Sequence, residues 1–163
     1  MRPLPANQLD PRVKNVWRLN DALWICLICA STLGCLQVLR IAPNLVNLAN
    51  ILTVAGVAAW AVLLVIWLAV LPPIRYMRWR YEITDDYLDI ARGIFWRKRF
   101  VVPFIRVQNT DTRQGPILRA FGLATVTVST AAGEHAIPGL DAQVADKLRD
   151  QAAELARLAR EDV

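Results

Sequence analysis

The sequence predicts an α+β membrane protein, in which a two-helix transmembrane hairpin is followed by a small β-barrel or sandwich capped by a C-terminal amphipathic α-helix. Three observations predict this fold. Two long apolar runs without charge lie between Ala22 and Leu71. Short alternating segments separated by turn residues follow them, which is typical of antiparallel strands. The chain then ends in a stretch of helical period with one apolar stripe.

Residues 1–20 form a polar segment that we expect to be a cytoplasmic basic arm. The segment holds one acidic residue, Asp10, against Arg2, Arg12, Lys14 and Arg18. Beside a membrane, each basic residue near an anionic surface contributes about 1 kcal/mol of attraction. The arm is therefore predicted to lie next to the inner leaflet.

Residues 21–73 are predicted to form the hairpin, with spans at about 22–40 and 49–71. Each run is uncharged and long enough for a hydrocarbon core of about 30 Å. A charge at mid-membrane costs about 2.5–3.5 kcal/mol, so Asp21 and Arg40 should mark the ends of the first span. Pro72 and Pro73 should end the second. A buried helix of a soluble protein is the alternative for the first run. A cleaved signal peptide is rejected, because the sequence has no small-residue cleavage site after the run.

Small residues in the second span predict close helix packing. Ala55, Gly56, Ala58 and Ala59 would let two helices approach, and Trp60 is expected between them. The cysteines all fall in the first span. Cys26 and Cys29 have the spacing of metal ligands, but no second pair and no histidine lies nearby in the sequence. We therefore interpret Cys26, Cys29 and Cys35 as packing residues.

Basic residues predict the orientation. They are frequent in the arm and directly after the second span, at Arg75, Arg78 and Arg80, whereas the linking loop has only Arg40 at its edge. The positive-inside rule then places both termini in the cytoplasm.

From residue 75 to 163 the spacing of apolar residues changes, first to the alternation of strands and then to the period of a helix. Leu123–Thr130 alternates, with Val126 and Val128 on one face, as in a half-buried strand. Pro103 should interrupt a strand because proline cannot donate to a ladder. Asp141 is a plausible N-cap for a helix over 141–160. Its expected apolar stripe is Val144, Ala145, Leu148, Ala152, Leu155 and Leu158.

Two groups of polar residues are candidates for binding. Arg97, Lys98 and Arg99 either hold an anionic lipid or small anion, or form a solvated hairpin beside the membrane. Arg106, Gln108, Asn109 and Asp111, with Arg119 after a turn, are either paired with one another, for instance as an Arg–Asp pair, or form a surface for a ligand or partner. His135 is expected to be a solvent residue in a hairpin loop.

Catalysis has little support in the sequence. The chain has one histidine, no glycine-rich phosphate loop and no nucleophile motif. We therefore predict no enzyme activity, no cofactor and no metal. The excess of basic residues lies beside the predicted membrane spans and is explained by membrane topology. Nucleic-acid binding is therefore not predicted either.

Short segments spread over the chain from about residue 75 onward together form a specific pattern. They are Tyr81–Thr84, Arg92–Gly93, Val102–Pro103, Arg106–Asn109, Gln114–Pro116, Phe121–Ala124, Thr130–Ala131, Pro138–Leu140 and Lys147–Arg149. In this pattern the chain resembles the bacterial pleckstrin-homology-like (PH-like) domains of the YdbS type, small proteins that carry two membrane helices ahead of the domain. Val107 departs from the family pattern, in which isoleucine is more usual at that position.

The resemblance implies a multi-pass protein of the bacterial inner membrane that acts without catalysis as an interaction or scaffold module, with a loose association to envelope stress or resistance. Its implied partners are the lipid bilayer and either a related membrane protein with several PH domains or a second copy of the chain. Two alternatives remain at this point. One is an anionic-lipid or small-anion binding domain, and the other is an accessory subunit of a membrane transport complex.

Overall fold

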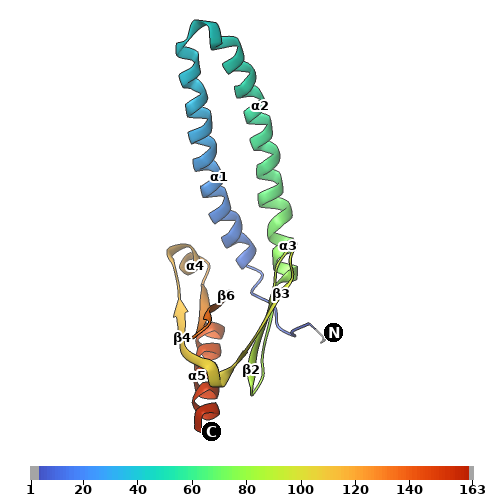
Figure 1. The fold of residues 1–163 in the computed structure, drawn as a ribbon, viewed down its shortest axis with the longest axis vertical. Helices are drawn as coiled ribbons and strands as arrows, with labels where there is room; N and C mark the ends of the chain where they lie inside the picture. The colour runs from blue at the N-terminus through green and yellow to red at the C-terminus, as the bar shows by residue number, and fades with distance from the viewer. Residues whose placement is uncertain (1–3, 162–163) are drawn as a thin grey trace. The chain divides into compact units, whose positions relative to one another are not determined.

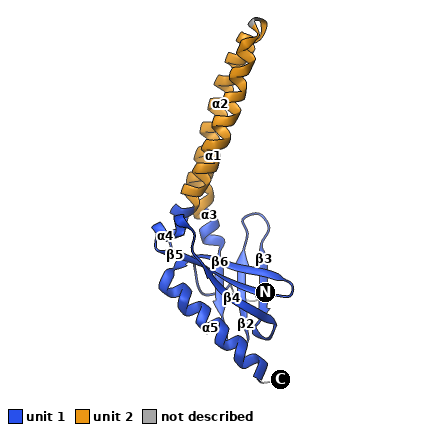
Figure 2. Ribbon diagram, turned by 90° about the vertical axis from the view of Figure 1, so that its left-hand side faces the viewer, with its two compact units in different colours: residues 1–16, 74–163 blue, residues 17–73 orange. Residues whose placement is uncertain are grey.

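The computed structural model describes residues 4–161, whose elements are shown in Figure 1. Arg2, one of the basic residues of the predicted arm, lies outside the described residues. The chain divides into two compact units (Figure 2). One unit contains the N-terminal residues through Val16 together with the chain from Ile74 onward, and the other is Trp17–Pro73.

Two long helices dominate the unit Trp17–Pro73. Helix α1 covers Val13–Val38, and short 3₁₀ turns at Leu39–Ile41 and Pro43–Leu45 lead into α2, Val46–Val65. Both helices are long and apolar enough to cross a membrane. Gly56 of α2 is the point of close approach, because a Cβ there would lie 3.7 Å from Leu33 of α1. Trp60 donates a hydrogen bond to Thr32 at 3.1 Å, so it lies between the two helices as expected.

The second helix continues past Pro72 and Pro73, where the second span is expected to end. A π-helical turn, Ile66–Val70, follows α2, and α3 then runs over Leu71–Arg78. The two prolines cannot donate to carbonyls one turn earlier. The π turn directly before them is where the hydrogen-bond spacing changes, which is how a helix absorbs such a defect. The helix therefore continues to Arg78.

The other unit contains two three-stranded antiparallel sheets. Sheet A has the order β1-β2-β3, with β1 Arg80–Ile83, β2 Tyr87–Arg92 and β3 Lys98–Pro103. Sheet B has the order β4-β5-β6, with β4 Val107–Arg113, β5 Leu123–Thr130 and β6 Gly133–Asp141. A 3₁₀ turn, Phe104–Arg106, joins the sheets, and the short helix α4, Pro116–Ala120, joins β4 to β5. No ladder connects the two sheets within residues 4–161, so the domain is PH-like without being a closed barrel.

Helix α5, Ala142–Glu161, packs on the 3₁₀ turn and on sheet B. Asp141 accepts a hydrogen bond from the Gln143 amide at 3.0 Å, as expected of an N-cap. The buried stripe is Ala145, Leu148, Ala152 and Ala156. Val144 and Leu158, which the sequence placed on that stripe, are 45% and 42% exposed. The contact face is therefore rotated toward the alanines, which let the helix approach the sheet closely.

The N-terminal arm packs against both sheets. Asn7 pairs with Tyr81 of β1, and the Asp10 amide donates to the Gly139 carbonyl of β6 at 3.1 Å. Leu9 and Val13 are buried. The arm thus fills the corner between the free edges of β1 and β6, a placement that the sequence did not suggest.

Candidate binding surfaces

Six of the residues singled out from the sequence separate into three places in the domain. Arg97, Lys98 and Arg99 line a pocket beside the β2–β3 hairpin. Arg106 and Gln108 line a cavity where β3 meets β4. Arg119 lies exposed in α4 and lines neither of them.

The first place is a pocket of about 500 Å³, which we call the basic pocket. Strand β1, the β2–β3 hairpin, the end of α3 and Leu4 of the arm form its wall. Sequence reasoning identified only the basic residues of the hairpin, because α3 and β1 supply Arg78 and Arg80 from an earlier part of the chain. The basic residues that line it are Arg78, Arg80, Arg92, Arg97, Lys98 and Arg99.

Arg99 is fixed by a carboxylate at the edge of the basic pocket. Its guanidinium donates to both oxygens of Asp89, with Nε 3.0 Å from each. The Asp89 side chain is only 3% exposed. The hydrogen bond to Asp89 raises the pKa of Arg99, and Glu82 adds to this effect. Arg99 is therefore held by an ion pair with Asp89, which neither interpretation of residues 97–99 included.

The hairpin tip beside the basic pocket exposes two aromatic side chains. Phe95 is 85% exposed and Trp96 is 81% exposed. Gly93 makes the turn possible with φ 118°, and a Cβ at this position would lie 1.9 Å from the Trp96 carbonyl oxygen. The same tip lines a hollow shared with Arg75 and Trp79.

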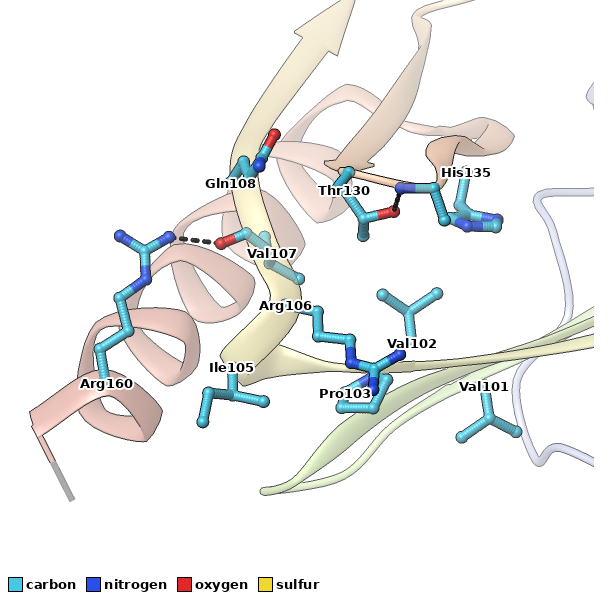
Figure 3. A pocket seen from close by; sticks show the side chains of 12 residues that line it. Val101, Val102, Pro103, Ile105, Arg106, Val107, Gln108, Thr130, His135 and Arg160 are labelled. Carbon is cyan, nitrogen blue, oxygen red and sulfur yellow. Dashed lines mark hydrogen bonds between the residues drawn. The ribbon is translucent and has the colours of Figure 1, made fainter. Parts of the chain in front are cut away.

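The second place is an open groove along β4. A cavity of about 750 Å³ lies between the end of β3 and the start of β4, and a hollow of about 370 Å³ continues between β4 and α5. We call the two together the edge groove. Figure 3 shows Ile105 and Arg106 at the junction of the strands and Arg160 of α5 donating to the Val107 carbonyl.

The edge groove follows a strand edge that pairs with no other strand in the described chain. Strand β4 pairs with β5 on one side only, and outside that ladder the backbone bond that its residues make in the described chain is from the Val107 amide to the Phe104 carbonyl. Such an edge presents free amides and carbonyls to any extended segment. Arg106, which is exposed beside it, forms no ion pair with residues 4–161.

Only some of the polar side chains of β4 pair with one another. Asp111 pairs with Arg113 at 3.1 Å, and Arg113 also approaches Glu134 at 3.4 Å. The Arg–Asp pair expected in this region therefore exists, but its arginine is neither Arg106 nor Arg119. His135 also differs from its prediction as a solvent residue. It is half-buried in β6, with its ring 5.2 Å from that of Phe100, because β6 begins at Gly133 and its alternation directs the side chain toward sheet A.

Arg12 fixes the N-terminal arm to the domain. Its guanidinium pairs with Asp10 at 2.9 Å and with Asp141 at 2.7 Å, and it donates to the Phe121 carbonyl at 3.2 Å. The hydrogen bond from Arg12 lowers the pKa of Asp10 and, with the Gln143 amide, that of Asp141. No cluster of side chains that could hold a metal ion occurs between residues 4 and 161.

Comparison with known proteins found a matching family and similar proteins. A family profile described as "Bacterial PH domain" matches residues 38–156. The chain is 38% identical over 165 residues to the UPF0699 transmembrane protein YdbS of Bacillus subtilis, covering all of both proteins. It is also 28% identical over 91 residues to the UPF0699 transmembrane protein YdbT of the same organism, covering 53% of this chain and 18% of that protein. No solved structure matches.

Proposed function

Because the chain belongs to the bacterial PH domain family, we propose that it is a non-catalytic, membrane-anchored interaction module. Its domain binds another membrane protein at the cytoplasmic face of the bacterial inner membrane. The His135 ring lies 5.2 Å from that of Phe100 at the edge groove, and the cysteines lie in the apolar helix α1.

The observation that carries this proposal is the edge groove. A free strand edge binds an extended segment by adding it to the sheet, where main-chain hydrogen bonds supply affinity and flanking pockets supply specificity. Strand β4 has such an edge, and cavities lie at its start and along α5. Ile105, 48% exposed, and Arg106 stand at the entrance as an apolar and a cationic contact.

The partner that we propose is a longer membrane protein of the same family. YdbT of Bacillus subtilis matches this chain over only 18% of its own length, so a protein can hold a domain of this kind within a much longer chain. A homologous domain would present an edge strand of similar length, and two such edges can pair with each other. A second copy of this chain is the competing occupant.

Contacts within the domain support the proposed orientation. Asp10 and Arg12 precede the first span, whereas Gly139 and Asp141, to which they bond, follow the second. These contacts support a hairpin with both ends on the same side of the membrane. The basic residues on both sides of the hairpin favour the cytoplasm as that side, by the positive-inside rule.

The test is site-specific photo-crosslinking in the native host. A photoreactive residue replaces Gln108 on β4 or, as the control, exposed Lys147 on α5, and crosslinked products are identified by mass spectrometry after purification in mild detergent. We expect the Gln108 probe to capture a longer PH-domain protein, and Arg106→Glu to abolish this product while Arg119→Glu leaves it unchanged.

Three results would contradict the proposal. They are equal capture from Lys147, capture of only a second copy of the chain, and a purified protein without a stoichiometric companion. The identity of a captured companion would show whether the module serves envelope stress, resistance or a transport complex.

A further inference from the structure

The most exposed apolar side chains of the domain gather around the basic pocket. Among the described residues outside Trp17–Pro73, the four most exposed large hydrophobic side chains are Leu4, Met77, Phe95 and Trp96, at 67%, 59%, 85% and 81%. Leu4 and Met77 line the basic pocket itself. Phe95 and Trp96 line the adjoining hollow. Apolar and aromatic side chains set among cations are typical of surfaces that lie in a lipid interface.

The charge of the basic pocket is largely uncompensated. Asp89 holds Arg99, and Arg92 stacks over Phe100 at 5.2 Å. The side chains of Arg78, Arg97 and Lys98 form no hydrogen bond or ion pair within the described part of the chain, and no acidic residue lines the pocket. The pocket therefore attracts an anion.

Arg80 marks the place where an anion would bind. It lines the pocket, and its Nε is buried without an acceptor among residues 4–161. The strand register fixes its position, because Arg80 lies opposite Ala91, which in turn lies opposite Arg99. A buried charged N–H group without an acceptor is unfavourable, and a phosphate oxygen in the pocket would supply one.

The pocket residues Met77 and Arg78 follow closely on the second apolar run in the chain. They end α3, which continues directly from that run. At 1.5 Å per residue, Arg78 lies about 10 Å along the helix from Leu71, near the outer limit of an interfacial layer that is about 5–8 Å deep on each side of a bilayer.

We propose that the basic pocket binds the phosphate of an anionic phospholipid from the membrane that the chain spans, with Phe95 and Trp96 at the boundary between headgroups and acyl chains. Uncompensated cations favour an anionic over a zwitterionic lipid, and the four exposed apolar side chains favour a lipid over a soluble phosphate. This site lies outside the edge groove and needs no protein partner, so it goes beyond the proposed function.

The test uses the full-length protein in detergent with equal amounts of phosphatidylglycerol and phosphatidylcholine, and native mass spectrometry counts the retained lipids. The wild type is compared with Arg78→Gln/Arg80→Gln and with the matched control Arg119→Gln/Lys147→Gln, which removes two exposed cations elsewhere. We expect the wild type and the control to retain phosphatidylglycerol selectively, and the pocket variant to lose this preference by about tenfold or more.

A second variant covers the case in which loss of Arg80 disturbs folding. Phe95→Ser/Trp96→Ser changes only exposed side chains, and in nanodiscs containing phosphatidylglycerol it should increase hydrogen exchange of the β2–β3 hairpin. Equal retention of both lipids by the wild type, or an unchanged preference in the pocket variant, would overturn the proposal. Inorganic phosphate that is retained without lipid and displaces phosphatidylglycerol would also overturn it, because the site would then bind a soluble anion.

Discussion

Arg12 joins two acidic residues that lie far apart in the sequence. Asp10 belongs to the arm and Asp141 to the end of β6, and both carboxylates bond the same guanidinium. Each has a pKa below its usual value, chiefly because of the Arg12 hydrogen bond. A carboxyl group with a lowered folded-state pKa stabilises the fold above its unfolded-state pKa, and this contribution is lost as the pH falls through the folded-state value.

The Arg12 contacts therefore predict an acid-sensitive arm. Comparing the wild type with Arg12→Gln, we expect a constant difference in thermal stability between about pH 7 and pH 5, because both carboxylates are ionised there in the folded and unfolded states. The difference should shrink below about pH 4. Thermal unfolding followed by circular dichroism at stepped pH measures it, and a difference that grows on acidification would refute the assignment.

At the residue scale, the sequence identified charged groups but not their partners. The basic trio 97–99 was correctly seen as a cluster, yet the pairing of Arg99 with Asp89 depends on the register between β2 and β3. Arg78 and Arg80 join the same pocket only through folding. Partners across strands are set by register and by tertiary packing, which a single sequence does not display.

At the element scale, Gly139 determines how closely the arm approaches β6. Its φ is 64°, and a Cβ there would lie 2.1 Å from Cγ2 and 2.6 Å from Cβ of Val13. The short distance to Val13 Cβ means that a rotamer change cannot relieve the contact. Gly122 offers a matched comparison, because it has φ 65° with only the tip of the Arg12 side chain nearby, at 3.5 Å.

We therefore predict different effects of the same substitution at these two glycines. Gly122→Ala should cost about 1–2 kcal/mol of unfolding free energy for its left-handed backbone. Gly139→Ala should cost about 1–3 kcal/mol more, because overpacking displaces Val13. Chemical denaturation measures both values, and limited proteolysis of the arm should accelerate only for Gly139→Ala. Equal costs would mean that the contact between the arm and β6 contributes nothing.

Helices and strands with a strong local sequence pattern were predicted most accurately. Strand β5 matches its predicted range, Leu123–Thr130, because alternation and turn residues mark both ends. The prediction treated it as half-buried, but Thr127 on its second face is also buried. The helix continues past Pro72 and Pro73 because a preceding π turn accommodates them.

At the scale of the whole molecule, the domain is assembled from two segments that lie on either side of the spans. Leu9 is 2% exposed and Val13 is fully buried. Burying such side chains contributes about 1.5–3 kcal/mol each, a large part of the net stability of a small domain. Residues 74–163 alone should therefore form an incomplete domain.

This discontinuity predicts the behaviour of soluble fragments. Residues 74–163 should aggregate or melt at low temperature, because the edges of β1 and β6 lack the arm. Residues 4–16 joined to residue 74 by a flexible glycine–serine linker should give a soluble, cooperatively folding domain. Size-exclusion chromatography and calorimetry distinguish the two fragments, and Leu9→Asp in the fusion serves as the control that should abolish the gain. Equal stability of the two fragments would refute the requirement for the arm.

The overall architecture was predictable, whereas the role of the arm was not. Uncharged runs and alternating segments, together with the family resemblance, suffice for a hairpin followed by a PH-like domain. Residues 4–16 lack a strand period, and Gly139, against which Val13 packs, follows 126 residues later in the chain. Local pattern carries no information about such a contact.

The two-part domain has a consequence for biosynthesis. The arm leaves the ribosome first, and its partners Tyr81, Gly139 and Asp141 are made only after both apolar helices. If a chain crossed the membrane only once, its arm would lie on the opposite face from the sheets, and the edges of β1 and β6 would stay without the arm. The domain could then be completed only in a chain whose two hairpin ends lie on one face of the membrane.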